Sequence, residues 1–119
     1  MILRESGEMY LETIYMLSKH NEHVRSIDIV KDMGFSKPSV SHAMGLLKEH
    51  NYIVIDSSGY ITLTEEGMTI AKKIAERHEV LTQILIRLGV PADIAAEDAC
   101  KMEHTISDVT FEAIKKHIG

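Results

Sequence analysis

The sequence predicts a mostly α-helical fold that contains one small β-hairpin. Apolar residues recur at helical spacing along most of the 119-residue chain, and glycine or proline follows several of these stretches. Two short runs rich in β-branched and aromatic residues flank a polar loop, which is typical of a hairpin. Apolar residues make up 45% of the chain, enough for one domain or two small units, and no apolar run is long enough to span a membrane.

The first part of the chain has the pattern of helices joined by a tight turn. A leading helix is predicted over residues 5–19, and a short helix over residues 26–33 with Ser26 as its N-cap. Gly34 should end the short helix, because glycine readily takes the left-handed conformation. The next helix is predicted over residues 36–50, with the hydroxyl of its first residue as the cap. Helix, tight turn and helix in this order predict a helix-turn-helix.

A β-hairpin is predicted directly after these helices. Residues 52–55 and 60–63 would form its strands, and the polar loop between them ends in Gly59. Thr64 is the predicted N-cap of a long helix that runs to about Leu88. A helix-turn-helix followed by a hairpin is a winged helix-turn-helix. Two further helices are predicted behind it, one over residues 93–105 and one from a cap at residues 107–108 to about His117.

A winged helix-turn-helix of this kind would bind DNA through the start of its third helix, which enters the major groove. Lys37 suits a phosphate, and Pro38 suits the methyl group of thymine. The expected DNA contacts are Ser36, Lys37, Pro38, Ser39, Ser41 and His42 on that helix, and Ser57 and Ser58 at the tip of the hairpin.

The charge of the chain opposes DNA binding. The net charge is −5, and residues 1–72 carry seven Lys or Arg against ten Asp or Glu. Phosphate contacts favour basic residues, so we expect weak binding unless a bound cation offsets this charge.

Cys100, Glu103 and His104 form the most distinctive cluster of the sequence. Their spacing of i, i+3 and i+4 places a thiol, a carboxylate and an imidazole on one face of a helix. Sulfur, oxygen and nitrogen donors together suit a divalent transition metal better than calcium or magnesium. The plainer interpretation is a buried apolar cysteine beside a solvated Glu-His pair. A single cysteine also excludes an internal disulfide and predicts a cytoplasmic protein.

With these features, the chain resembles the diphtheria-toxin-repressor family of metal-dependent transcriptional regulators over essentially all 119 residues. The resemblance rests on five segments in order: residues 8–15, 36–41, 63–67, 77–79 and 100–104. It implies a winged helix-turn-helix followed by a helical dimerisation domain. The expected division is a DNA-binding domain in residues 1–70 and a metal-binding and dimerisation domain in residues 71–119.

The resemblance also implies a ligand set for the metal. The matching positions are Met9, Glu12, His78, Cys100, Glu103 and His104. Met9 and Cys100 are the choices of the iron-dependent branch, where manganese regulators carry an aspartate and a glutamate, whereas Glu12 is a feature of the manganese branch. Thr82 and Ala96 stand where iron-dependent members place two ligands of a second site, so that second site is not expected in its usual form.

The function implied is that of a repressor of metal-uptake genes, not an enzyme. It would bind a palindromic double-stranded operator as a homodimer, joined through its C-terminal helices, when loaded with Fe(II) or, as second choice, Mn(II). Co(II), Ni(II) or Zn(II) would bind in vitro. No membrane and no small organic substrate are expected.

Three alternatives remain open at the level of the sequence. The first is a winged-helix regulator that responds to a small molecule and uses the Cys-Glu-His run structurally. The second is a metal-dependent hydrolase, although the sequence contains no HExxH or comparable catalytic motif. The third is a protein-interaction module that does not bind DNA, which the acidic charge favours.

Overall fold

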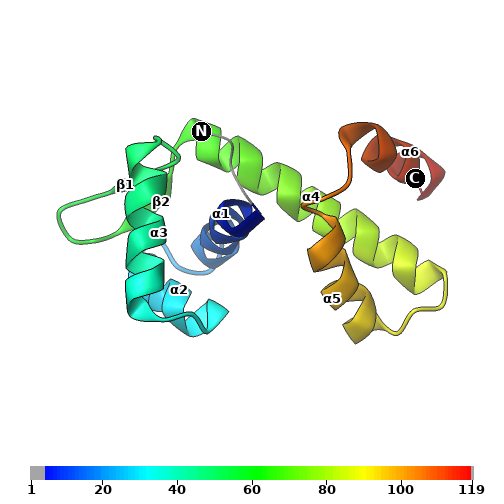
Figure 1. Ribbon diagram of the computed structural model, residues 1–119, viewed down its shortest axis with the longest axis horizontal. Coiled ribbons are helices and arrows are strands. Elements are labelled where there is room, and N and C mark those ends of the chain that lie inside the picture. Colours follow the sequence, from blue (N-terminus) through cyan, green and yellow to red (C-terminus); the bar gives the residue numbers. More distant parts are fainter. Residues whose placement is uncertain (1–4, 119) are drawn as a thin grey trace. The chain divides into compact units, whose positions relative to one another are not determined.

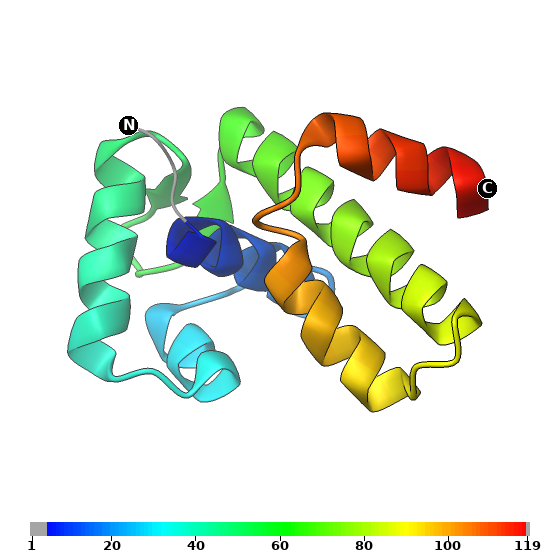
Figure 2. The same cartoon turned by 45° about the vertical axis from the view of Figure 1, so that its right-hand side comes forward.

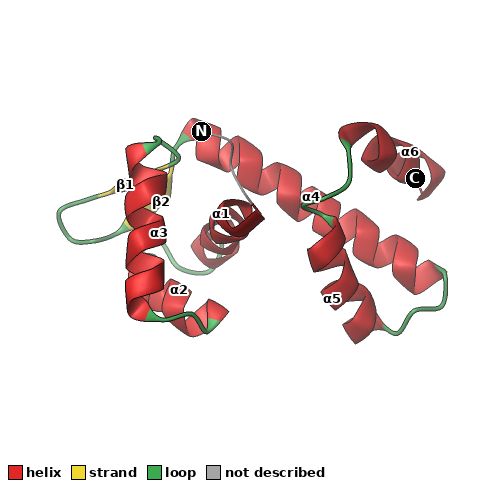
Figure 3. Cartoon of the chain, viewed as in Figure 1, coloured by secondary structure: helices red, strands yellow, loops and turns green. Residues whose placement is uncertain are grey.

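The structure, a computed structural model, describes residues 5–118. Within that range it contains six α-helices and one two-stranded antiparallel sheet, drawn in Figure 1 and coloured by type in Figure 3. The chain divides into two compact units, one through Lys72 and one from Lys73 onward. None of the helices in the described range combines the length and apolar character needed to cross a membrane.

The first unit is a winged helix-turn-helix. It contains α1 (Glu5–Ser18), α2 (Ser26–Met33), α3 (Lys37–Glu49), β1 (Ile53–Ile55) and β2 (Ile61–Leu63). The two strands pair in antiparallel register, with Val54 opposite Thr62. Side chains alternate along each strand, so Ile53 and Ile61 are buried while Val54 is exposed. The predicted fold class, mostly helical with one small hairpin, is confirmed.

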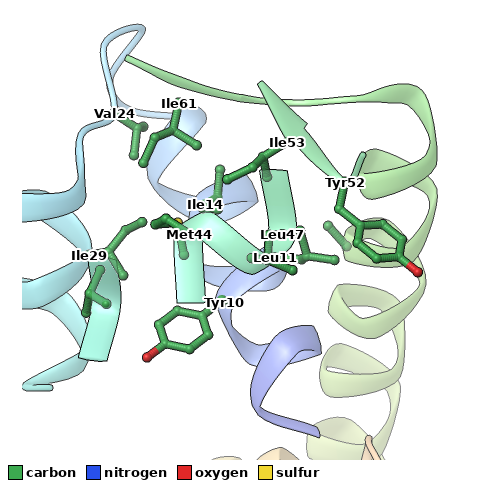
Figure 4. Packing of buried hydrophobic residues seen from close by; sticks show 12 residues of the cluster. Tyr10, Leu11, Ile14, Val24, Ile29, Met44, Leu47, Tyr52, Ile53 and Ile61 are labelled. Carbon is green, nitrogen blue, oxygen red and sulfur yellow. The ribbon is translucent and has the colours of Figure 1, made fainter. Parts of the chain in front are cut away.

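The core of the first unit lies between its helices and the hairpin. Figure 4 shows Leu11 and Ile14 of α1 among buried side chains of α3, β1 and β2. Both side chains are completely buried, and each such burial contributes roughly 1.5–3 kcal/mol to stability. The buried residues of α1 and α3 recur at helical spacing, so each helix packs one apolar face against this core.

Local capping explains where the helices of the first unit begin and end. Gly34 ends α2 with a φ of 73°, as predicted. The hydroxyl of Ser36 caps α3 by accepting the backbone N–H three residues ahead. The prediction that Ser26 caps α2 is wrong, because Arg25 occupies that position and its backbone N–H donates to Asp28 Oδ2 at 2.9 Å. A carboxylate that reaches back from the first turn replaces the hydroxyl cap.

The second unit consists of helices only. The long helix α4 (Glu65–Arg87) begins in the first unit and is followed by α5 (Ala92–Met102) and α6 (Asp108–Ile118), seen together in Figure 2. Thr64 caps α4, as predicted, by accepting the N–H of Gly67 at 3.1 Å. The helix predicted over residues 93–105 ends earlier, at Met102, and Glu103 continues its helical conformation for one residue. The chain then turns toward α6.

Candidate metal centre

Three elements of the second unit supply the side chains of the candidate metal centre. His78 lies on α4, Cys100 on α5, and Glu103 and His104 in the turn that follows α5. The sulfur, a carboxylate oxygen and an imidazole nitrogen of the Cys100, Glu103 and His104 group all lie within 4.8 Å of one another. The helix that was expected to carry all three ends before the last two. Glu103 keeps helical backbone angles, which preserves the predicted spacing at that residue.

Glu103 is the central residue of this cluster. Its side chain is completely buried, and its Oε2 atom lies 2.8 Å from Nδ1 of His78. Its Oε1 atom lies 3.3 Å from Nε2 of His104, but it accepts no hydrogen bond of normal geometry from a residue of the described range. A buried carboxylate oxygen without a hydrogen bond is costly, and a bound cation would remove that cost.

The donor set fits a transition metal. A thiol, a carboxylate and two imidazoles are the ligands that divalent transition metals prefer, whereas calcium and magnesium prefer oxygen alone. The side chains of Glu103 and His104 are buried, while that of His78 is 37% exposed. Three residues of one unit, Cys100, Glu103 and His104, therefore have donor atoms close enough to share one ion, and His78 contacts the carboxylate of the same Glu103.

Met9 and Glu12, the two other predicted ligands, lie on α1 in the first unit. Both are half-buried. They stay predictions from the sequence resemblance.

The predicted DNA contacts are all exposed in the first unit. Residues 36–39, 41 and 42 lie at or just before the start of α3, and Ser57 and Ser58 lie in the loop between β1 and β2. Asp56 shapes that loop, since its Oδ1 atom accepts the N–H groups of Ser58 and Tyr60. The first turn of α3 and the tip of the hairpin are thus available to a partner.

A cationic and aromatic cluster beside the hairpin was not predicted. The guanidinium carbon of Arg25 lies 4.6 Å from the ring centre of Tyr60, and the ring of His23 stacks on the same tyrosine at 4.4 Å. Spacing along the sequence gave no signal for this contact, because the tyrosine is separated from the other two residues by more than thirty positions.

Arg77 was also missed as a functional candidate, although the sequence held a signal. Ile74, Arg77 and Leu81 follow helical spacing and all three are buried, so the arginine belongs to the apolar face of α4. A charged residue in such a stripe is rare unless it is paired.

Comparison with known proteins agrees with this architecture. Residues 2–66 match the family model of the iron-dependent repressor N-terminal DNA-binding domain, and residues 64–119 match that of the iron-dependent repressor metal-binding and dimerisation domain. A helix-turn-helix-type transcriptional regulator of Methanocaldococcus jannaschii is 33% identical over 115 residues, covering 95% of this chain and 92% of the relative. The transcriptional regulator MntR of Escherichia coli is 32% identical over 112 residues, covering 94% and 72% of the two chains.

Solved structures give the same result. The manganese regulator SloR superimposes with a TM-score of 0.84 at 30% identity, covering 99% of this chain and 54% of the other. A manganese-dependent transcriptional repressor in complex with manganese gives a TM-score of 0.86 at 26% identity, covering 95% and 52%. This chain spans about half the length of these two structures. Both are transcriptional regulators and not enzymes, which agrees with the expectation from the sequence. On the matches along its whole length, the chain belongs to the diphtheria-toxin-repressor family of metal-dependent transcriptional regulators.

Proposed function

We propose that this protein is a repressor that binds a palindromic operator as a homodimer when it holds a divalent transition metal, and that it controls genes of metal uptake. The observation that carries the proposal is the fully buried Glu103 between two imidazoles and a thiol, with one carboxylate oxygen that lacks a hydrogen bond within the described residues. His78, Cys100, Glu103 and His104 would hold the metal, with Met9 and Glu12 as further ligands on the strength of the sequence resemblance. A thiol ligand requires a reducing compartment, which favours the cytoplasm.

The DNA-binding surface we propose is the exposed start of α3 together with the tip of the hairpin. Ser36, Lys37, Pro38, Ser39, Ser41 and His42 would contact the major groove, and Ser57 and Ser58 the adjacent backbone. Arg25 adds a cation beside the hairpin, held against Tyr60. In a homodimer two such surfaces would contact half-sites spaced by about one helical turn of DNA or a multiple of it.

The C-terminal helices are the proposed dimer surface. Ile94 of α5 and Val109 of α6 are large apolar residues that are 46% and 81% exposed. Phe111, by contrast, is buried within its own chain and contacts Arg77. Within α5 and α6, the most exposed large apolar residues therefore lie near the start of each helix.

The metal we propose is Fe(II), with Mn(II) as the second choice. Cys100 provides a sulfur donor, which favours Fe(II), Co(II), Ni(II) or Zn(II) over Mn(II). The solved structures that are named as manganese regulators favour the opposite choice. Because availability in the cell, and not affinity alone, selects among these ions, Co(II) and Zn(II) are also expected to bind in vitro.

Selection of DNA in the presence and absence of metal tests the proposal. A pool of randomised duplexes is incubated anaerobically with the protein and Fe(II), Mn(II) or Zn(II), or with a chelator, and bound DNA is sequenced. We expect palindromic sites to be enriched with metal and not with the chelator. The double variant Cys100→Ala, Glu103→Ala serves as the control.

Two outcomes would contradict the proposal. Enrichment of the same sites by the metal-stripped double variant would refute metal dependence, and absence of metal from the purified wild-type protein after incubation would favour a small-molecule regulator. No selection of DNA under any condition would favour a protein-interaction module.

A further inference from the structure

Arg77 is a charged residue held inside the second unit. It lies on α4 between the buried Ile74 and Leu81, and only 5% of its surface is exposed. Its guanidinium lies over the ring of Phe111, 5.3 Å from the centroid. A buried arginine is unfavourable unless its donors are satisfied, so the groups that it binds indicate why it is there.

Those groups all lie in the turn that follows α5 and at the start of α6. Nη1 of Arg77 donates to the backbone carbonyl of Glu103 at 3.1 Å and to that of Ile106 at 2.8 Å. Nη2 donates to the carboxylate of Asp108, the first residue of α6. The two carbonyl groups stand on either side of His104 in the sequence. One side chain thus fixes both ends of the short segment that presents Glu103 and His104.

The geometry requires a guanidinium and not merely a positive charge. Arginine holds its donors in a rigid planar fork, whereas lysine is a single point of charge on a flexible stem. Nε of Arg77 has no hydrogen-bond partner among residues 5–118. A buried donor without a partner lowers the stability of the folded protein, so stability alone does not explain why an arginine is buried here. A buried arginine that carries this cost, next in sequence to His78 and bonded to the turn that holds Glu103 and His104, points to a role in the geometry of the cluster.

We propose that Arg77 is a positioning residue of the metal centre, which sets the affinity and coordination geometry by holding the turn from Glu103 to Ile106 against α4. This inference rests on the proposed function, because it assumes that Glu103 and His104 are metal ligands. Arg77 itself does not contact the metal in this scheme. Arg77 would act through the backbone of the turn. Its substitution should therefore change the affinity for metal even in a variant whose fold is unchanged.

The variant Arg77→Lys tests the proposal, because it keeps the charge and removes the fork. Lys73→Met is the matched control, since Nζ of Lys73 lies 3.0 Å from the same Asp108 carboxylate but the lysine side chain is 54% exposed. Co(II) is the probe under anaerobic conditions. The measurements are the Kd, the visible absorption spectrum of the bound ion, and the melting temperature of the metal-free protein.

We expect Arg77→Lys to weaken Co(II) binding by about tenfold or more, the effect typical of losing a group that orients metal ligands. Its Co(II) spectrum should also shift, because the ligands are no longer held in the same geometry. Lys73→Met should bind Co(II) within about twofold of wild type, with an unchanged spectrum. A purely structural role would lower the melting temperature of Arg77→Lys and leave the spectrum and Kd alone, which would overturn the proposal.

A surface variant keeps the proposal testable if Arg77→Lys fails to fold. Asp108→Asn removes the anion that orients Nη2, and the Asp108 side chain is 69% exposed, so the protein should remain folded. We expect Co(II) binding to weaken about threefold, and an unchanged Kd would overturn the proposal. If the wild-type protein binds no Co(II) at all, the proposed function fails instead, and the two failures are thereby distinguished.

Discussion

A single carboxylate, that of Glu103, determines what the candidate metal centre can do. The side chain is completely buried, with His78 on one oxygen and His104 near the other. A buried carboxylate with one oxygen that accepts no hydrogen bond from the described residues destabilises the folded state, and a bound cation would offset that effect. Loss of this charge should therefore stabilise the metal-free protein, and metal should reduce or reverse that stabilisation.

Glu103→Gln is predicted to separate these two effects. Without metal, the amide keeps the shape and a hydrogen bond to His78 but removes the buried charge, so the free energy of unfolding should rise by about 1–3 kcal/mol. With metal at about one hundred times the Kd, wild type should gain about 2.7 kcal/mol while the variant gains little. Denaturant unfolding with and without Co(II) measures both. A variant that is less stable than wild type without metal would show that the charge is already compensated.

At the scale of the elements, the start of α4 depends on one close approach of backbone to backbone. Gly67 lies in the first turn of α4, and a Cβ atom built there would stand 2.1 Å from the carbonyl oxygen of Tyr52. That residue immediately precedes β1, and its carbonyl also accepts the N–H of Thr64 at 3.1 Å. No side chain can move aside to relieve such a contact, so the junction between the hairpin and α4 requires glycine.

Gly67→Ala should consequently destabilise the protein by roughly 1–3 kcal/mol, the usual penalty for overpacking, or more if the backbone cannot shift. Gly45→Ala is the matched control, because Gly45 is also helical, in α3, and a Cβ there meets nothing within 4 Å. Alanine at that position should stabilise the protein by up to about 1 kcal/mol through helix propensity. Thermal or denaturant unfolding of the two variants should give shifts of opposite sign, and equal shifts would contradict the close approach.

The elements also show what the sequence could and could not predict. Periodicity predicted α1, α3 and the hairpin because burial of Leu11, Val40 and Ile53 follows directly from their spacing. The predicted cap of α2 was wrong by one residue, and the predicted end of α5 was wrong by three. Both depend on which side chain reaches a free backbone group, as the carboxylate of Asp28 does, and spacing carries no information about that.

The candidate site, too, could be predicted from the sequence only in part. The spacing of Cys100, Glu103 and His104 predicted a cluster that the structure places within 4.8 Å. His78 entered only through the resemblance to a family, because its partner Glu103 lies 25 residues away. The contacts of Arg77 are still longer-range, at 26 to 31 residues, and so only the folded chain reveals them.

At the scale of the whole molecule, the acidic charge of the protein would give a bound metal ion an electrostatic effect on DNA binding, in addition to any structural effect. The net charge of −5 repels DNA, and the exposed cations of α3 are few, with Lys37 and Lys48 among them. A divalent cation held by Glu103 and its neighbours would reduce this repulsion and so raise the affinity for DNA. Any ordering of the chain by the metal would raise the affinity further. DNA affinity and metal content should therefore rise together.

Metal binding is predicted to protect α1 as well as the second unit from hydrogen exchange. The resemblance assigns Met9 and Glu12 of α1 as ligands together with residues of the second unit. Ligands drawn from both units would raise the free energy of local opening in each of them. Exchange is measured by mass spectrometry with Co(II) and with a chelator, for wild type and for the double variant Met9→Leu, Glu12→Gln. Wild type should gain protection in peptides from both units, and the variant only in peptides that contain His78 or residues 100–104. Equal protection patterns in the two proteins would remove Met9 and Glu12 from the ligand set, because their side chains would then make no difference to the effect of the metal.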